Sequence, residues 1–318
     1  MPNKFVHRGS LKQNGDKYLS IYSLLQSIIK YRKEAYFIFH GQSSLPYLFL
    51  AWVFIRGLNM SAIKLTYDVH DLHEKPKKED GNVRSLIRFY IFYYIEKYIF
   101  SRNRIKKITV SVGLANEMQK IYGSSKPTIV YNVSGMMRPS NTCVKLNNSL
   151  LYFGTAGRFP FLLLDAIQAS GIDLHVYGRG MNSEWMISEG YAKYVDNVTF
   201  FGAYSPDDLS FIHRYKCLVI YAPNDISLNF KYSMPNKLFQ ALGSGLSVVV
   251  SSNFSEMIET FSAIRGAVIS IDPESVQNDM RRLTSGMNRE SIEQSLAFVE
   301  SLKLSSIENY KFALGLDK

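Results

Sequence analysis

Residues 229–252, NFKYSMPNKLFQALGSGLSVVVSS, place an expected helix start beside a basic side chain. Ser233 is expected to cap a helix whose first turn holds Pro235, which suits that turn because its missing N–H would be unpaired there. The free N–H groups up to Asn236 and the positive end of the helix dipole favour an anion, and Lys237 adds a full positive charge. A capped surface helix with a chance lysine is the alternative. Because capping alone does not explain the whole segment, we predict a phosphate site here.

Residues 67–74, YDVHDLHE, form a second cluster of chemically active groups at the end of a candidate strand. Clusters of this kind serve acid–base chemistry, metal binding or plain solvation of a loop. Their spacing matches no helix-borne metal site, D-x-D occurs nowhere in the chain, and no CxxC motif is present, so no metal and no other cofactor is expected. The members are Asp68, His70, Asp71, His73 and Glu74.

Short β-rich runs alternate with helical patterns along nearly the whole chain. These elements must position both the predicted phosphate site at 229–252 and the cluster at 67–74. Strand–helix alternation predicts an α/β protein with parallel sheets of the doubly wound type. Ligands of such sheets bind beyond the carboxyl ends of the strands. The candidate strands are 36–40, 62–67, 106–111, 127–132, 150–154, 173–178, 197–202, 216–222, 246–252 and 267–271.

The net charge of +10 is unevenly distributed: residues 1–150 carry a balance of +14 and residues 151–318 a balance of −4. The sign changes at MMRPSNTCVKLNNS, which lacks periodicity and is typical of a linker. Two Rossmann-like domains facing a cleft are therefore expected, with the ligand site in that cleft. The predicted organisation is an N-terminal domain over 1–135, a linker over 136–149, and a C-terminal domain over 150–318 whose final helix, about 289–312, can return to the first domain.

The segment 229–252 resembles the nucleotide-sugar half of GT-B glycosyltransferases, specifically the family 4-like group of bacterial capsule and O-antigen assembly. Many of those enzymes read KYS-x-PNK-L-F-E-x-x-x-x-G-x-P-V. The chain departs at Gln240, where the family usually has a glutamate that grips the ribose, and at Ser247, where proline is usual. Glutamine can still bond a ribose hydroxyl, but without charge assistance. The matching residues are Lys231, Tyr232, Ser233, Pro235, Asn236, Lys237, Leu238, Phe239, Gly245 and Val248.

The resemblance continues upstream and implies further donor contacts. In LLYFGTAGRFPFLLLDAI, 150–167, it implies a glycine loop that reaches the donor diphosphate and a basic residue that contacts it. LHVYGRG and NVTFFGAYSPDDL resemble family segments near the nucleobase, with structural turns as the alternative. The implied donor-binding residues are Gly154, Gly157, Arg158, Gly178, Arg179, Tyr204, Tyr232, Ser233, Asn236, Lys237 and Gln240.

YDVHDL resembles the family's vHDl motif, which implies that His70 contacts the donor sugar. Most relatives retain the anomeric configuration, so the resemblance favours retention, in which the leaving phosphate accepts the acceptor's proton. An inverting enzyme would need a base, for which Asp68, Asp71 and Glu74 are candidates. The chain begins late relative to the family, which leaves open a reduced N-terminal domain.

The aromatic-rich segment 88–107, RFYIFYYIEKYIFSRNRIKK, follows the basic run KPKK at 75–78. One interpretation is an interfacial helix that docks on anionic lipid. The other is a largely buried helix, since only Glu96 and Lys97 interrupt its apolar character. Both can hold if the helix is buried and the neighbouring loops contact the membrane.

Together these features predict a metal-independent hexosyltransferase of surface polysaccharide synthesis, with a nucleotide-sugar donor and a saccharide or lipid-linked saccharide acceptor. We expect it in the cytoplasm, peripheral on the inner face of the cell membrane, because the start lacks an apolar leader and Cys143 and Cys217 cannot form a disulfide framework. The alternatives are a nucleotide-sugar epimerase of the same architecture and a catalytically inactive relative that binds a polyanion or lipid. No nucleic-acid partner is expected.

Overall fold

The computed structural model describes residues 21–33, 35–73, 83–133, 148–221, 227–272 and 286–316. The chain divides into two compact units: unit 1 is Met1–Tyr131 with Ser305–Lys318, and unit 2 is Asn132–Leu304. Glu74, the basic run 75–78, Cys143 and most of the expected linker lie outside the described residues.

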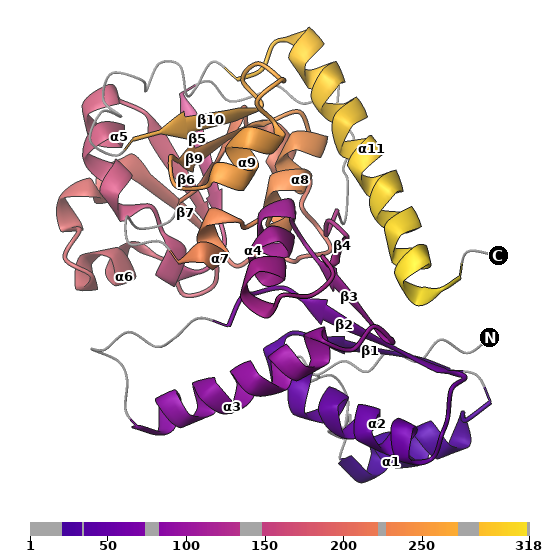
Figure 1. The fold of residues 1–318 in the computed structure, drawn as a ribbon. Helices are drawn as coiled ribbons and strands as arrows, with labels where there is room; N and C mark the ends of the chain where they lie inside the picture. Colours follow the sequence, from indigo (N-terminus) through magenta and orange to yellow (C-terminus); the bar gives the residue numbers. More distant parts are fainter. Residues whose placement is uncertain are drawn as a thin grey trace. The chain divides into compact units, whose positions relative to one another are not determined.

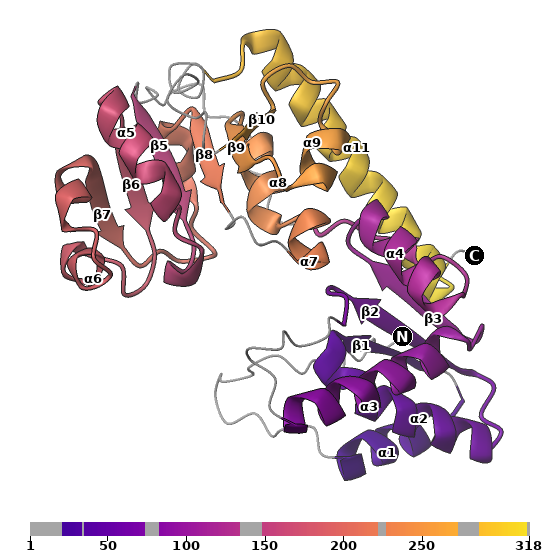
Figure 2. The same ribbon diagram turned by 60° about the vertical axis from the view of Figure 1, so that its left-hand side comes forward.

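Unit 1 is built on a parallel sheet with strand order β1-β2-β3-β4. Helices α1, α2 and α3 cover one face of this sheet and α4 covers the other (Figures 1 and 2). The strands are β1 (Ala35–His40), β2 (Ile63–Val69), β3 (Ile105–Thr109) and β4 (Thr128–Ile129). The helices are α1 (Ile21–Lys30), α2 (Leu45–Gly57), α3 (Val83–Phe100) and α4 (Val112–Tyr122), with a 3-10 turn η1 (Gln42–Ser44) before α2.

Helix α4 illustrates how local sequence sets both ends of an element. Its first turn is capped by Ser111, whose side chain accepts a hydrogen bond from the N–H of Leu114 at 3.2 Å. Its C-cap is Gly123, which has a left-handed φ of 62° that favours glycine. These signals set the first and last turns of α4.

The long helix α11 (Arg289–Leu314) begins in unit 2 and ends in unit 1. The side-chain amide of Asn309 donates to the carbonyl of Ile129 at 2.8 Å. The hydroxyl of Ser306 accepts from the N–H of Tyr131 at 3.0 Å. The end of the chain is thereby hydrogen-bonded to unit 1 next to β4.

Helix α3 is buried only over its last turns, where Glu96, Ile99 and Phe100 are inaccessible. The carboxylate of Glu96 accepts hydrogen bonds from the hydroxyls of Tyr67, at 2.8 Å, and Tyr122. Glu96, which was expected to interrupt the apolar character of the helix, is thus a buried residue of α3 held by two hydrogen bonds. In the first two thirds of α3 most side chains are exposed and none is buried, so the alternative of a largely buried helix is wrong for that part.

Unit 2 is a six-stranded parallel sheet of order β10-β9-β8-β5-β6-β7. Figure 2 shows α8 and α9 alongside β8 to β10, and α5 and α6 alongside β5 to β7. The strands are β5 (Ser149–Phe153), β6 (Asp173–Tyr177), β7 (Val198–Gly202), β8 (Cys217–Ile220), β9 (Ser247–Ser251) and β10 (Val268–Ile271). The helices are α5 (Leu164–Ser170), α6 (Ser183–Ser188), α7 (Leu228–Lys231), α8 (Asn236–Gly243) and α9 (Ser255–Thr260). The 3-10 turns are η2 (Ala156–Arg158), η3 (Phe161–Leu163), η4 (Ala192–Asn197) and η5 (Ser210–Arg214).

The predicted α/β architecture with parallel sheets is confirmed, and each candidate strand is present with ends shifted by a few residues. The largest difference is β4, which keeps only two residues of the expected 127–132. Among the described residues, no helix is long and apolar enough to span a membrane.

Candidate active site

A pocket of about 480 Å³ lies in unit 2 at the carboxyl ends of the strands and the start of α8. Its walls come from the segment after β5, the segment after β7 and the first turns of α8. This is the end of a parallel sheet where ligands bind. The lining residues are Tyr152, Phe153, Gly154, Thr155, Arg158, Tyr204, Pro206, Leu209, Pro235, Asn236, Lys237 and Gln240.

Among the residues that the structure describes, two positive side chains, Arg158 and Lys237, line this pocket, and no acidic residue does. Arg158 is exposed on η2, with its guanidinium 5.0 Å from the ring centroid of Phe230. Lys237 is partly buried on the first turn of α8, with its ammonium 5.4 Å from the ring centroid of Tyr152. Burial, followed by the positive charge of Arg158, lowers the pKa of Lys237 to about 8. The full charge expected on Lys237 is therefore partly lost just above neutral pH, and the pair is set to bind an anionic group.

The affinity of this pocket for a nucleoside diphosphate is expected to fall by about tenfold as Lys237 loses its proton. The loss should begin near pH 8 and extend upward, since bound phosphate raises the pKa of the lysine further. The ligand contributes little, because the second ionisation of a phosphate lies near pH 6. Calorimetric titration with UDP on both sides of pH 8 measures the effect. Lys237→Arg, which stays charged, should give a flat profile, and a flat wild-type profile would contradict the assignment.

Helix α8 starts later than predicted. Its N-cap is Pro235, with φ −71° and ψ 150°, and no side chain caps the helix. Met234 precedes a proline and is kept out of the helical region by steric clash. Ser233 therefore does not cap α8, and its own N–H donates to the carbonyl of Phe230 at 3.0 Å. The helical N–H groups at the pocket belong to Asn236 and Lys237 instead.

The glycines of the predicted loops differ in what they permit. Gly154 has a φ of 154°, and an added Cβ would lie 3.2 Å from the hydroxyl of Tyr152. At Gly178 an added Cβ would lie 2.6 Å from the carbonyl oxygen of Gly154, so this glycine lets the segments after β5 and β6 touch. At Gly157 an added Cβ meets no atom within 4 Å, so packing within the protein does not require a glycine there, and its contact with the donor stays a prediction.

Six of the residues implied as donor-binding line the pocket and five do not. The lining six are Gly154, Arg158, Tyr204, Asn236, Lys237 and Gln240, and the others are Gly157, Gly178, Arg179, Tyr232 and Ser233. Gly178 is buried and Arg179 exposed, whereas Tyr232 and Ser233 belong to the turn between α7 and α8. Sequence reasoning missed Tyr152, Phe153, Thr155, Pro206 and Leu209, and in Tyr152 and Phe153 it saw only a buried strand.

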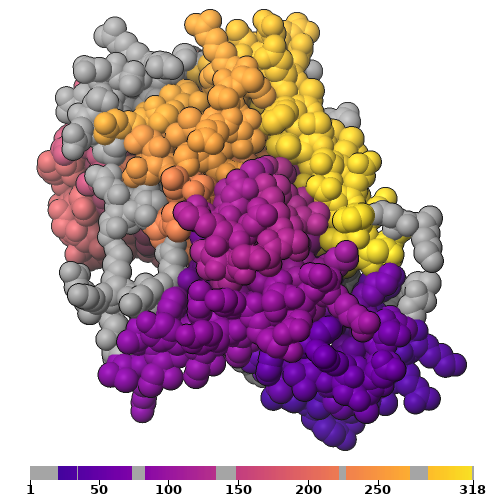
Figure 3. All heavy atoms as spheres, viewed as in Figure 1, coloured from indigo at the N-terminus to yellow at the C-terminus, as the bar shows by residue number. Residues whose placement is uncertain are grey.

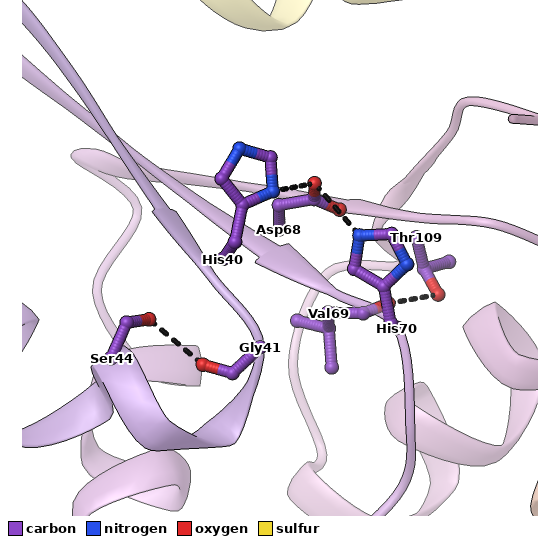
Figure 4. Close-up of polar contacts among 7 residues, drawn as sticks. All are labelled: His40, Gly41, Ser44, Asp68, Val69, His70 and Thr109. Atoms are coloured by element: carbon purple, nitrogen blue, oxygen red, sulfur yellow. Dashed lines mark hydrogen bonds and ion pairs between the residues drawn. The ribbon is translucent and has the colours of Figure 1, made fainter. Parts of the chain in front are cut away.

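In unit 1, the carboxylate of Asp68 lies between two imidazoles (Figure 4). Its Oδ2 is 2.6 Å from Nδ1 of His40 and 3.0 Å from Nε2 of His70. Asp68 and His70 were singled out in the sequence, but His40 was not. His40 ends β1 and is paired in register with Asp68 on β2.

Hydrogen bonding and burial act against each other in this trio. Burial of Asp68 would raise its pKa, but the hydrogen bonds from His40 and His70 and their charges lower it below the usual value. The hydrogen bond to Asp68 raises the pKa of His70, with burial opposing and the charges of Asp68 and Asp71 adding to the effect. Asp71 is exposed. His73 is outside the trio, with Nε2 3.0 Å from the carbonyl of Phe89.

Comparison with known proteins gives matches in structure alone. No family model matches the chain, and no curated protein sequence matches it. TarM has a TM-score of 0.59 at 14% identity, over 91% of this chain and 55% of TarM. Anabaena Alr3699/HepE in complex with UDP has a TM-score of 0.61 at 12% identity, over 93% of this chain and 81% of HepE. WaaG, a glycosyltransferase involved in lipopolysaccharide biosynthesis, has a TM-score of 0.52 at 13% identity, over 99% of this chain and 97% of WaaG.

The chain has the fold of the GT-B glycosyltransferases. It spans only a little over half the length of the TarM chains it matches. Within this GT-B fold, the pocket lined by Arg158 and Lys237 belongs to the C-terminal Rossmann-like unit. The trio of His40, Asp68 and His70 belongs to the N-terminal one.

Proposed function

We propose that the protein is a glycosyltransferase that moves a hexosyl group from a nucleotide-diphosphate donor to a saccharide acceptor. The observation that carries this proposal is the unit 2 pocket, which Arg158 and Lys237 line together and whose described lining residues include no carboxylate. The pocket also belongs to a fold that the chain shares with HepE, whose structures are in complex with UDP and with UDP-glucose. A uridine diphosphate sugar is therefore the first donor to test.

In the proposed reaction the bond between the anomeric carbon and the donor phosphate breaks, and a bond to the acceptor oxygen forms. Arg158 and Lys237 neutralise the charge that develops on the leaving diphosphate, which stabilises the transition state. The N–H groups at the start of α8 add two donors near Asn236. Because the protein supplies these charges itself, we propose that the transfer step needs no metal ion.

Other side chains are proposed to orient the donor. Gln240 bonds a ribose hydroxyl and Tyr204 lies beside the nucleobase, as both line the pocket. His70 contacts the donor sugar. We propose retention of configuration, with the acceptor proton passing to the leaving phosphate; in an inverting reaction Asp68 or Asp71 would take it. The remaining donor-binding candidates are Gly154, Gly157, Gly178, Arg179, Tyr232 and Ser233.

We further propose a lipid-linked acceptor in capsule, O-antigen or lipopolysaccharide synthesis and a peripheral position on the cytoplasmic face of the membrane. Support comes from α3, whose exposed apolar side chains recur at helical spacing on one face. In Figure 3 the first half of α3 stands at the surface in purple. Arg84 and Arg88 flank this stripe and can meet anionic headgroups. The stripe consists of Val83, Ile87, Tyr90, Ile91 and Tyr94, which are 73%, 54%, 42%, 52% and 63% exposed.

Hydrolysis of a panel of nucleotide sugars by the purified full chain tests the proposed function, because slow hydrolysis identifies the donor without its acceptor. We expect release of nucleoside diphosphate from one donor and calorimetric binding of that diphosphate. Formation of an epimer without release would favour an epimerase. If the protein neither turns over a donor nor binds a nucleoside diphosphate, but binds a polyanion in a salt-dependent way, this result would favour an inactive binding protein.

A further inference from the structure

The trio of His40, Asp68 and His70 brings three metal-ligating side chains to one edge of the unit 1 sheet. Asp68 and His70 are two positions apart, so alternation of side chains along the chain places them on one face. His40 is paired with Asp68 across β1 and β2, which adds the third group beside them. The N–H of Gly41 donates to the carbonyl of Asp68 at 2.8 Å and ties the two strand ends together. The positions of His40 and Asp68 therefore follow from the register of β1 and β2, and His70 comes directly after β2.

Three potential ligand atoms converge within this trio. Nδ1 of His40, a carboxylate oxygen of Asp68 and a ring nitrogen of His70 all lie within 4.8 Å of one another. The donor atoms around a tetrahedral Zn²⁺ lie roughly 3.3 Å apart. The distances of 2.6 and 3.0 Å from Oδ2 of Asp68 must therefore open by less than about 1 Å. The His70 side chain is 40% exposed and that of His40 26% exposed, so both rings have room to move.

We propose that His40, Asp68 and His70 form a binding site for a divalent transition-metal ion of the zinc class. Two imidazoles and one carboxylate suit Zn²⁺, Co²⁺ or Ni²⁺ better than Mg²⁺ or Ca²⁺, which prefer oxygen ligands. Three protein ligands leave one position of a tetrahedral ion open. Because both histidine side chains are partly exposed, the ion can reach the site from solvent.

This site goes beyond the proposed function, and its three ligands belong to unit 1, whereas the residues that line the donor pocket belong to unit 2. A bound ion would engage the His70 nitrogen that now donates to Asp68. It would thereby fix the ring that we propose to contact the donor sugar. The ion is thus a modulator of His70 rather than a participant in the transfer step.

The competing explanation is that Asp68 merely holds both rings by hydrogen bonds, and the two explanations differ in what they predict for added metal. A hydrogen-bonded trio is complete without an ion, whereas a metal site takes up one equivalent near neutral pH and releases protons from the imidazoles. Titration of the metal-stripped full chain with Co²⁺, followed by its visible absorption, and with Zn²⁺, followed by calorimetry, separates them.

We expect saturable binding of one ion per chain and a loss of affinity of at least about tenfold in His40→Ala, Asp68→Asn and His70→Gln. His73→Gln is the matched control, because this imidazole lies three residues from His70 and outside the trio. Circular dichroism checks that each variant is folded. Should Asp68→Asn fail to fold, the more exposed His70→Gln decides the matter.

Absence of saturable binding in the wild-type chain would overturn the proposal. So would wild-type affinity in the folded variants, which would place the ion elsewhere on the chain. Because metal binding is measured without substrate, neither result depends on sugar transfer. A failure of the metal site and a failure of the proposed transferase activity are therefore distinguishable.

Discussion

Lys237→Ala is expected to lower donor hydrolysis and sugar transfer by at least about tenfold. The ammonium is one of two positive side chains among the described residues that line the pocket, and none of these residues is acidic, so its removal leaves only Arg158 to face a diphosphate there. Hydrogen bonds to charged groups contribute about 1.5–3 kcal/mol, and the loss of a transition-state donor usually costs more in rate than in ground-state binding. Steady-state hydrolysis of the donor identified by the panel measures the effect.

The fold of unit 2 is expected to survive this substitution. Burial lowers the pKa of Lys237 to about 8, which means that the folded state binds the lysine proton less tightly than the unfolded state. Below that pH the charged lysine therefore opposes folding, and its removal relieves the cost. The thermal midpoint of Lys237→Ala near neutral pH should equal or exceed that of the wild type, while nucleotide binding falls.

Arg158→Ala should produce a similar loss of at least about tenfold in turnover, because its guanidinium is the other positive group of the pocket. Lys231→Ala is the control for both variants. Lys231 is exposed on the neighbouring helix α7, outside the pocket lining, with its ammonium 5.3 Å from the ring centroid of Tyr232. Wild-type turnover in both pocket variants would remove the phosphate assignment.

The strands were predictable because most are continuous apolar runs bounded by turn residues, as expected for parallel sheets covered on both faces. The short strand β4 shows the limit of that signal. Only Thr128 and Ile129 pair with β3, although the apolar pattern extends beyond them. How far a strand pairs depends on its neighbour's length, and β3 itself ends at Thr109.

The location of the basic pocket of unit 2 was predictable, and its details were less so. The PNK segment correctly indicated a helix start near Lys237, but Ser233 was wrongly predicted as the N-cap. A cap at Ser233 would require Met234 to be helical, and the following proline disfavours that conformation. Spacing alone also could not show that an added Cβ would meet other atoms at Gly154 but none within 4 Å at Gly157, since this depends on what lies opposite each residue. Tyr152 lines the pocket although its strand position marks it only as core.

His40 shows why the side-chain cluster of unit 1 was harder to predict from the sequence than the pocket of unit 2. Its partner Asp68 lies on another strand, and the pairing depends on the register between β1 and β2, which no motif encodes. The pattern of α3 was equally ambiguous, because an apolar helix can face either a protein core or a lipid surface. The exposure of Ile87 and Ile91, at 54% and 52%, places this part of the helix outside the protein core and is compatible with the proposed lipid contact.

Ile87→Gln with Ile91→Gln is expected to weaken binding to anionic vesicles by more than about tenfold. A fully buried isoleucine contributes about 1.5–3 kcal/mol, and these two side chains have about half of that contribution still available for burial in lipid. Glutamine removes the apolar surface without changing the net charge, so the loss should persist at every salt concentration. Co-sedimentation with vesicles of phosphatidylcholine and phosphatidylglycerol measures it.

Arg84→Gln with Arg88→Gln separates the electrostatic contribution from the apolar one. These variants should show a weaker preference for phosphatidylglycerol and a shallower salt dependence, because each basic side chain contributes about 1 kcal/mol at an anionic surface. Leu162→Gln with Ile187→Gln is the control, since these side chains are 51% and 53% exposed but belong to unit 2. If the α3 variants bind vesicles as tightly as this control, the stripe does not bind lipid and a protein partner becomes the better explanation for its exposure.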